Sequence, residues 1–192
     1  MKKHIMALVI AAACLLFLFG YGENVEKYKA KFNSVPFFEI EYPVGDWIMD
    51  DSSHLDKNTA DYTWVFTLYN QQHYIICSVE QLTEYDDFSI FKADQQEIDE
   101  FVNATVEAYD YYNCKFTGMH RFEVSKGVKT AELPFLEYTL SDPESGESIY
   151  IETVSNGKVL SFEIFDMYLE RISSIDEKQG ILLDVLNTFN VL

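Results

Sequence analysis

The side chains that most often do chemistry in proteins are present in this chain but scattered along it. The four histidines are His4, His54, His73 and His120, and no two of them have the spacing of a zinc motif. We therefore expect the histidines that follow the first 22 residues to lie on the surface or in turns. The chain contains no Gly-x-Ser-x-Gly elbow, phosphate-binding loop or Gly-x-Gly-x-x-Gly pattern. The sequence thus predicts no catalytic, cofactor-binding or metal-binding residues.

Two acidic segments are the strongest candidates for a calcium site. They contain Asp50, Asp51, Asp56 and Asp61 in the first, and Asp142, Glu144 and Glu147 in the second. Calcium takes six to eight oxygen ligands in a defined order, and neither segment has the register of an EF-hand. Because the chain holds 32 acidic residues, such clusters are expected as ordinary solvated loops.

Cys77 and Cys114 are the cysteines that follow the N-terminal leader, and each lies in a strand-like apolar run. Two interpretations stay open. An exported protein permits a disulfide between them, and two buried free thiols are the alternative.

Length, composition and charge limit the number of domains and the kinds of function that the protein can have. The chain has 192 residues and a mass of 22.3 kDa, which fits one domain with a short appendage. Hydrophobic residues make up 48%, enough for a sizeable core. The 14 basic residues against 32 acidic ones give a net charge of −18, which excludes phosphate-backbone binding to nucleic acids as the default role.

The first 22 residues have the pattern of a secretory signal peptide. Lysines at positions 2 and 3 precede an apolar run over 5–19, and Gly20 and Gly22 place small residues before a cleavage at Glu23. Cleavage there would leave 12 basic and 32 acidic residues, a net charge of −20. An uncleaved N-terminal anchor and lipidation at Cys14 are the alternatives, and each still predicts an extracytoplasmic protein. Residues 23–35, polar and mixed in charge, are expected to form a tether.

Alternating apolar residues predict seven strands. The runs are 37–42, 62–68, 74–79, 115–124, 131–140, 148–154 and 158–165. Asn156-Gly157 between the last two is the strongest hairpin signal. In the second run Trp64 shares its alternation with Phe66 and Leu68, so we expect Trp64 in the core, where replacement by Ala would destabilise the protein by about 3–5 kcal/mol.

Two helices are predicted from capping residues followed by apolar stripes. Asp94 and Glu97 have capping-box spacing before a helix near 94–110, and Ser174 with Glu177 begins a second one at the C-terminus. The predicted order is βββαββββα, an α+β fold with a mainly antiparallel sheet of about seven strands flanked by helices.

Three segments resemble PsbP-like proteins. The run 38–43 followed by Trp47 resembles their opening strand and turn, the hairpin 149–162 resembles their closing hairpin, and the ending over 185–189 is similar to theirs. The resemblance covers residues 36–192. It implies an α/β/α sandwich, in a superfamily that includes accessory proteins of the oxygen-evolving complex, Ran-binding nuclear import factors and exported bacterial proteins. Its members act mostly as binding or accessory modules, and no residues specific to photosystem or Ran binding match here.

The sequence therefore predicts an exported, non-enzymatic binding or accessory module without a cofactor. Its partner is expected to be a protein or another component of the cell envelope, and the negative charge favours a basic partner surface. The alternative is a carrier that holds a small apolar ligand in a pocket between sheet and helix, since aromatic residues make up 16% of the chain. A hydrolase with a site assembled from distant residues is a third hypothesis.

Overall fold

Ten strands, two α-helices and two short 3-10 helices make up the part of the chain that the computed structural model describes, residues 25–32, 35–43, 45–51, 62–126, 129–143, 146–168 and 172–191. The elements are β1 (Val25–Phe32), β2 (Val35–Pro43), β3 (Ile48–Asp50), β4 (Tyr62–Tyr69), β5 (His73–Gln81), η2 (Thr83–Tyr85), α2 (Gln95–Ala108), η3 (Asp110–Tyr112), β6 (Lys115–Lys126), β7 (Lys129–Asp142), β8 (Gly146–Ser155), β9 (Lys158–Asp166), α3 (Ile175–Leu186) and β10 (Asn190–Val191).

The strands form two antiparallel sheets. The larger has seven strands in the order β3-β4-β5-β9-β8-β7-β6, which confirms the predicted antiparallel sheet of about seven strands. The smaller sheet, β1-β2-β10, was not predicted. The strand expected over 37–42 is β2 and belongs to this smaller sheet, while the short β3 takes the edge position in the larger one.

Residues 25–32, expected to be part of a polar tether, instead form β1. The strand pairs with β2, and a 2.8 Å ion pair joins Lys27 to Glu41 directly across the hairpin. Tyr28 and Ala30 alternate with the charged residues and pack against the core of the protein. The expectation was wrong because the exposed Lys27 and Lys29 make the segment look polar, although they alternate with the residues that face the core.

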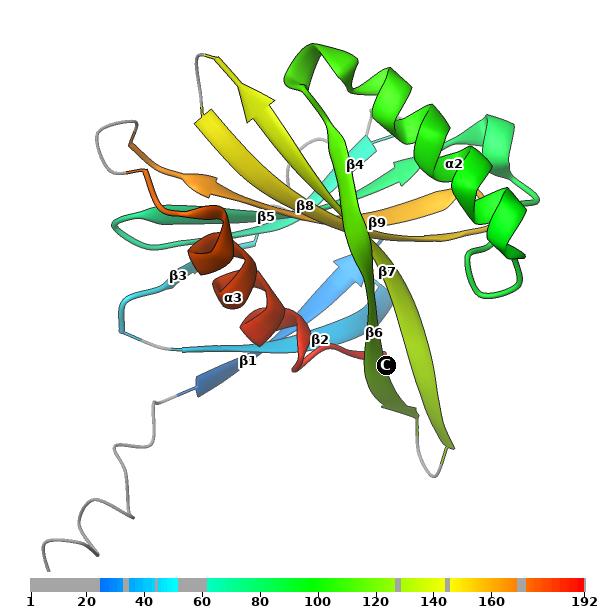
Figure 1. Ribbon diagram of the computed structural model, residues 1–192. Helices are drawn as coiled ribbons and strands as arrows, with labels where there is room; N and C mark the ends of the chain where they lie inside the picture. Colours follow the sequence, from blue (N-terminus) through cyan, green and yellow to red (C-terminus); the bar gives the residue numbers. More distant parts are fainter. Residues whose placement is uncertain are drawn as a thin grey trace, which may run out of the picture.

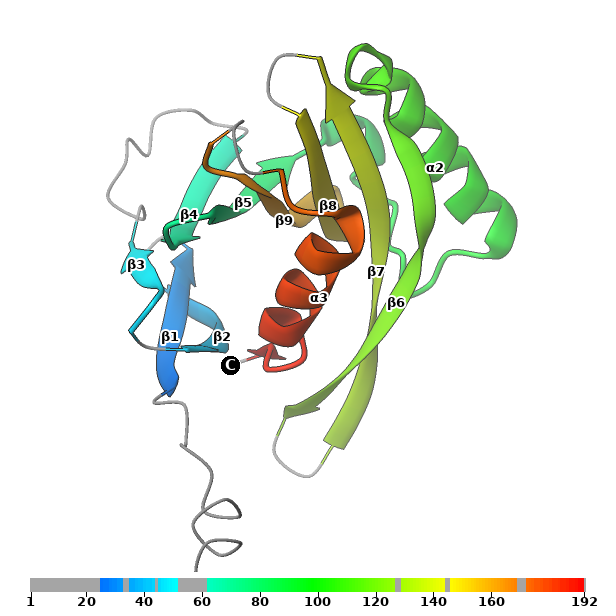
Figure 2. The same ribbon diagram turned by 60° about the vertical axis from the view of Figure 1, so that its left-hand side comes forward.

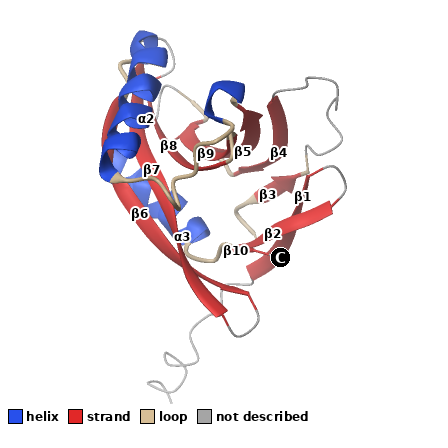
Figure 3. Ribbon diagram, turned by 90° about the vertical axis from the view of Figure 1, so that its right-hand side faces the viewer, coloured by secondary structure: helices blue, strands red, loops and turns tan. Residues whose placement is uncertain are grey.

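The helices lie on opposite faces of the seven-stranded sheet. Figures 1 and 2 show α2 on one face, and α3 together with the three-stranded sheet on the other. Figure 3 shows the same layers from the side. We call the two sides of the large sheet the α2 face and the α3 face. The arrangement confirms the predicted placement of helices on both sides.

Local sequence explains the ends of both helices and one hairpin. The Asp94 carboxylate accepts from the Glu97 N–H at 3.0 Å, and the Glu97 carboxylate accepts from the Asp94 N–H at 2.8 Å, a complete capping box. Ser174 caps α3 by accepting from the Glu177 N–H at 3.2 Å. Asn156 and Gly157 have φ of 51° and 70° in the β8–β9 turn, as a two-residue hairpin turn requires.

Each face of the large sheet has its own apolar core. On the α3 face five phenylalanines pack edge to face or stacked, with ring centroids 4.8–6.5 Å apart: Phe38, Phe66, Phe135, Phe162 and Phe189. On the α2 face a second core gathers the apolar stripe of α2 with strands β7, β8 and β9, through Ile98, Phe101, Leu136, Tyr138 and Val154. The core on the α2 face contains fewer residues than the core on the α3 face.

Trp64 is not in either core, so that prediction is wrong. Its side chain is 41% exposed, whereas those of Val65 and Phe66 are buried. The register of β4 against β5 shifts between Trp64 and Phe66, which is a β-bulge. The bulge breaks the alternation, and the Trp64 side chain therefore lies on the opposite face from that of Phe66.

Candidate functional site

A buried ionic cluster joins α3 to the ends of β8 and β9. Lys178 is fully buried, and its Nζ donates to Asp166 Oδ2 at 2.6 Å and to the Glu147 carbonyl at 2.5 Å. Burial alone would raise the pKa of Asp166, but Lys178 and hydrogen bonds from Ser173 outweigh it and lower that pKa. Since both charges are compensated, the cluster holds α3 against the sheet.

His73 and Ser173 lie beside this cluster and give the strongest resemblance to a catalytic arrangement. His73 Nε2 is 2.8 Å from Ser173 Oγ and 3.6 Å from Asp166 Oδ1, while His73 Nδ1 has no hydrogen-bond partner. In a serine triad the acid holds the ring nitrogen opposite the one that faces serine. Here serine and acid share one nitrogen, and burial lowers the pKa of His73. The geometry is that of a structural cluster. His73 closes the β4–β5 turn, as expected of a turn histidine, but its buried ring differs from the surface position that was the other expectation.

A second polar cluster joins α3 to β6 and β7 around Glu137, which is only 3% exposed. Its carboxylate accepts from Thr117 Oγ1 at 2.6 Å and from Gln179 Nε2 at 2.8 and 2.9 Å, and it lies 2.6 Å from His120 Nε2. Burial alone would raise the pKa of Glu137, but these partners together lower it. His120 is half-buried in β6 beside this carboxylate, so it too differs from the surface or turn histidine expected.

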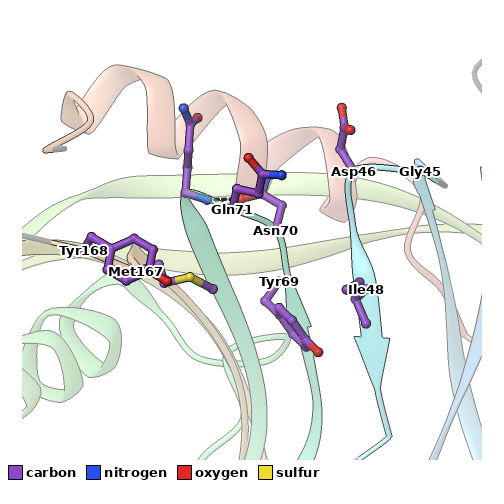
Figure 4. Close-up of a pocket in the computed structure, with 9 residues that line it drawn as sticks. Gly45, Asp46, Ile48, Tyr69, Asn70, Gln71, Met167 and Tyr168 are labelled. Carbon is purple, nitrogen blue, oxygen red and sulfur yellow. Dashed lines mark hydrogen bonds between the residues drawn. The ribbon is translucent and has the colours of Figure 1, made fainter.

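A wide hollow lies at the end of the sheet where β4 turns into β5. It has a volume of about 780 Å³ and is lined by Gly45, Asp46, Ile48, Tyr69, Asn70, Gln71, Gln72, Met167 and Tyr168. Figure 4 shows Ile48 and Tyr69 side by side on neighbouring strands. We call this the β-turn hollow. Ile48 and Tyr168 are 55% and 60% exposed, so apolar surface here is open to solvent.

Hydrogen bonds fix the wall of the β-turn hollow. Asn70 Oδ1 accepts from the N–H groups of Gln72 and His73 at 2.8 and 2.7 Å, which closes the turn. The Met167 N–H donates to the Gln72 carbonyl at 2.7 Å, which joins the end of β9 to that turn. The hollow therefore has a preformed wall of amide and aromatic side chains.

A smaller pocket lies beneath α2, at the other end of β5. Its volume is about 350 Å³, and its lining is Glu80, Leu82, Glu84, Tyr85, Phe101, Ala104, Thr105, Ala108, Tyr109, Tyr150, Glu152 and Val159. We call this the α2 pocket. Its most unusual residue is Glu152 of β8, which is 2% exposed and whose Oε1 has no hydrogen-bond partner.

Glu152 differs in charge state from an ordinary carboxylate. Burial, together with the nearby Glu80 carboxylate, raises its pKa to about 8, although interactions with Tyr150 and Tyr138 oppose the rise. The Tyr138 hydroxyl is also buried and lies close to Glu152 without a hydrogen bond of good geometry. Sequence reasoning missed this residue, yet Glu152 alternates with Tyr150 and Val154 on a single strand face, a signal that it points into a covered layer.

Cys77 and Cys114 are buried and do not form a disulfide with each other. Of the two interpretations of the sequence, a disulfide and two buried free thiols, the structure supports the free thiols. Burial raises the pKa of both, that of Cys114 to about 11. A thiol with a raised pKa is a poor nucleophile near neutral pH.

Several other predicted features lie outside the described residues: the leader with Cys14 and its cleavage at Gly22, the loop residues His54, Asp56 and Asp61, and Glu144. Within the described ranges no group of three or more histidine, cysteine or acidic side chains is placed to hold a metal ion. No helix in those same ranges is long and apolar enough to cross a membrane.

Comparison with known proteins identifies the fold. No protein-family model matches the chain, and no curated protein sequence matches it. Among solved structures, the chain is similar to the solution structure of cyanobacterial PsbP (CyanoP) from Synechocystis sp. PCC 6803. The match has a TM-score of 0.50 and 15% sequence identity, and it covers 90% of this chain and 96% of that one. In agreement with the resemblance of its opening strand and closing hairpin, the chain has a PsbP-like fold.

Proposed function

We propose that the protein is an exported, non-enzymatic binding module that engages a protein partner of the cell envelope through the β-turn hollow. The observation that carries this proposal is the exposed apolar surface around a preformed hollow. Ile48 and Tyr168 line it with more than half of their surface open. Exposed apolar patches of this kind, rimmed by polar groups, are typical of protein interaction sites.

Charge supports a basic segment as the part of the partner that binds here. Among the described residues of the lining of the β-turn hollow, Asp46 is the one that carries a charge. The exposed Asp50 and Asp51 follow at the end of β3 and directly after it. The whole chain carries a net charge of −18. A basic partner would be steered toward this surface and would associate faster at low salt.

The carrier hypothesis is less well supported by the lining of the pocket between sheet and helix. The α2 pocket has that position, but three carboxylates line it, those of Glu80, Glu84 and Glu152. Burial of an apolar ligand against carboxylates leaves their polar oxygens without partners and is unfavourable. The protein-binding proposal therefore takes precedence.

Site-specific photo-crosslinking in the native host tests the proposal. A photoreactive phenylalanine analogue replaces Tyr168 in the β-turn hollow, and the matched control replaces Tyr111, which is 79% exposed at a different site. We expect the Tyr168 probe to form one abundant crosslink to an envelope protein, retained at about 0.15 M salt, where charges beyond about 8 Å are screened. Equal products from both positions would contradict the proposal.

Two further readouts separate the alternatives. Copurification of a lipid or another apolar small molecule would favour the carrier, and reproducible turnover of a substrate would contradict both hypotheses.

N-terminal sequencing of the exported protein tests the localisation, because cleavage at the small residues should leave Glu23 as the first residue. A cytoplasmic protein that retains residues 1–22 would contradict export.

A further inference from the structure

The α2 pocket has a marked charge asymmetry. Its three carboxylates come from three separate elements, Glu80 from β5, Glu84 from η2 and Glu152 from β8. Among the described residues that line the pocket there is no lysine, arginine or histidine. Acidic side chains are thus gathered around one hollow, without a cationic side chain among the described residues of its wall.

One oxygen of the Glu152 carboxyl group, Oε1, lacks the partner that a buried polar atom requires. Buried polar groups in folded proteins are almost always hydrogen-bonded, and an unsatisfied one is costly. The buried Asp166 on the opposite face has its lysine at 2.6 Å, whereas Glu152 Oε1 has no partner and lines an open pocket. An unsatisfied acceptor of this kind, placed in a hollow, indicates a missing donor.

The walls of the α2 pocket are suited to an organic group. Tyr85 and Phe101 meet edge to face with ring centroids 5.0 Å apart, and Tyr109 and Tyr150 form a second pair at 6.2 Å. Aromatic faces attract ammonium and guanidinium groups. Leu82 also lines the pocket and can pack against an apolar stem. A volume of about 350 Å³ has room for one side chain or a small amine.

A metal ion fits this lining less well. Calcium takes six to eight oxygens at 2.3–2.6 Å. Within the described residues the carboxylates of Glu80, Glu84 and Glu152 do not form a group close enough to hold a metal together. An organic cation fits better, because its charged group can approach the carboxylates while its apolar part contacts the aromatic rings of the pocket.

We propose that the α2 pocket binds an organic cation, an alkylammonium or guanidinium group on a short apolar stem, with Glu152 Oε1 accepting its hydrogen bond. Glu80 and Glu84 add electrostatic attraction at the same pocket, and the tyrosine and phenylalanine rings contact the stem and the charged head. The cation belongs either to a free amine or to a lysine or arginine side chain of a peptide. The pocket and the β-turn hollow lie at opposite ends of β5, so this proposal does not depend on the docking proposed above.

Binding should release a proton. With a pKa of about 8, Glu152 is protonated in most molecules at pH 7, and a bound cation favours its ionised form. The titratable groups that line the pocket around Glu152 or interact with it are Glu80 of β5, Glu84 and Tyr85 of η2, Cys114 before β6, Tyr138 of β7, Tyr150 of β8 and Tyr109 after α2. Affinity should therefore rise by about tenfold from pH 6 to pH 7 and level off above pH 8.

Isothermal titration calorimetry of the full chain tests the proposal. The probes are agmatine as a free cation, the capped tripeptide acetyl-Gly-Lys-Gly-amide as a side-chain source, and n-butanol as a neutral analogue. Titrations at pH 7 in phosphate and in MOPS count the protons released, because the ionisation enthalpies of these buffers differ and neither carries a net positive charge that would compete for the pocket. We expect both cations to bind, n-butanol not to bind, and close to one proton to be released per cation.

A matched pair of variants separates the pocket from general negative charge. Glu152→Gln keeps the side-chain shape, removes the ionisable group, and should weaken binding at least tenfold and abolish proton release. The control is Glu163→Gln, because Glu163 lies on the same sheet face and has a raised pKa but lines a different hollow. Circular dichroism confirms that both variants fold.

The two cationic probes distinguish a site for a small molecule from a site for a peptide side chain. Tighter binding of agmatine identifies a small-molecule site, and tighter binding of the peptide identifies a side-chain site; either supports the proposal. Equal loss of affinity in Glu152→Gln and Glu163→Gln, binding of n-butanol as tight as that of the cations, or no binding of either cation at millimolar concentration would overturn it.

Discussion

Two buried glutamates lie on opposite faces of one sheet and differ in almost every physical respect. Glu137 on the α3 face is 3% exposed and Glu152 on the α2 face is 2% exposed. Glu137 interacts with Thr117, His120 and Gln179, and its pKa is lowered. Glu152 has an oxygen without a partner, and its pKa is raised to about 8. Equal burial thus leads to opposite protonation, because the neighbouring donors determine which form is stable.

The same contrast holds for the way in which the buried acidic side chains of the two faces are paired. On the α3 face the buried charges join α3 to the sheet, through Lys178 with Asp166 and through Gln179 with Glu137. On the α2 face, Glu152 Oε1 has no such partner among the described residues. A buried carboxyl oxygen without a partner, at the wall of a pocket, is the reason for the ligand proposed there.

The largest effect should come from breaking the ion pair on the α3 face. Lys178→Met leaves the Asp166 carboxylate buried without its lysine, and we expect the free energy of unfolding in urea to fall by about 3–5 kcal/mol. The double variant Lys178→Met/Asp166→Asn removes both charges and should recover part of that loss. A single variant within about 1 kcal/mol of the wild type would show that the pair does not hold α3 in place.

The next effect concerns Glu152 and depends on pH. Its folded pKa of about 8 lies above its ordinary value of 4.5, so the folded chain binds this proton more tightly than the unfolded chain does. The protein must therefore lose stability as pH rises from 4.5 through 8. Relative to Glu152→Gln, which mimics the protonated form, the wild type should lose about 3 kcal/mol between pH 5.5 and pH 9. Urea unfolding of both proteins at the two pH values measures the difference, and parallel stability curves would contradict a raised pKa.

Glu137 should show a smaller effect with the opposite sign. Its pKa is lowered in the folded chain, so its contribution to stability is present above the ordinary value of 4.5 and is lost as pH falls through the folded pKa. We expect Glu137→Gln to lower the free energy of unfolding by about 1–3 kcal/mol at pH 7. The reason is that a carboxylate oxygen, which accepts hydrogen bonds from its neighbours, is replaced by an amide group that donates them. The difference from the wild type should shrink at acidic pH. A cost that grows on acidification would contradict the assignment.

Sequence signals for helix caps and turns predicted much of the fold. The capping residues Asp94 and Ser174 begin α2 and α3 as expected, and the Asn156-Gly157 turn joins β8 to β9. These features depend on neighbours within a few residues. The three-stranded sheet escaped prediction for two reasons. β1 forms a local hairpin with β2, but its charged residues hid the strand pattern. β10 pairs with β2 across about 150 residues. Two residues of β10 carry no strand signal of their own.

The candidate site was less predictable than the fold. Lys178 lies on the same stripe of α3 as Leu182 and Val185, at spacings of four and seven, so its burial has a signal in the sequence. That Asp166 lies opposite it has no such signal, since the partner comes from another element. The same holds for Glu152, whose strand face is readable but whose lack of a donor depends on what α2 and η2 bring near it.

The smallest predicted effect uses the bulge in β4 to compare the two faces at adjacent positions. Phe66 is fully buried in the α3 core, and Phe66→Ala should destabilise the protein by about 3–5 kcal/mol. Trp64 is 41% exposed on the α2 face. Trp64→Ala should lower the free energy of unfolding by only about 1 kcal/mol, because much of the tryptophan surface already contacts water. Urea unfolding at one pH compares the two variants directly. Similar losses above about 3 kcal/mol would mean that Trp64 is covered in solution, and the most direct reading would then be that another chain or segment packs on this part of the α2 face.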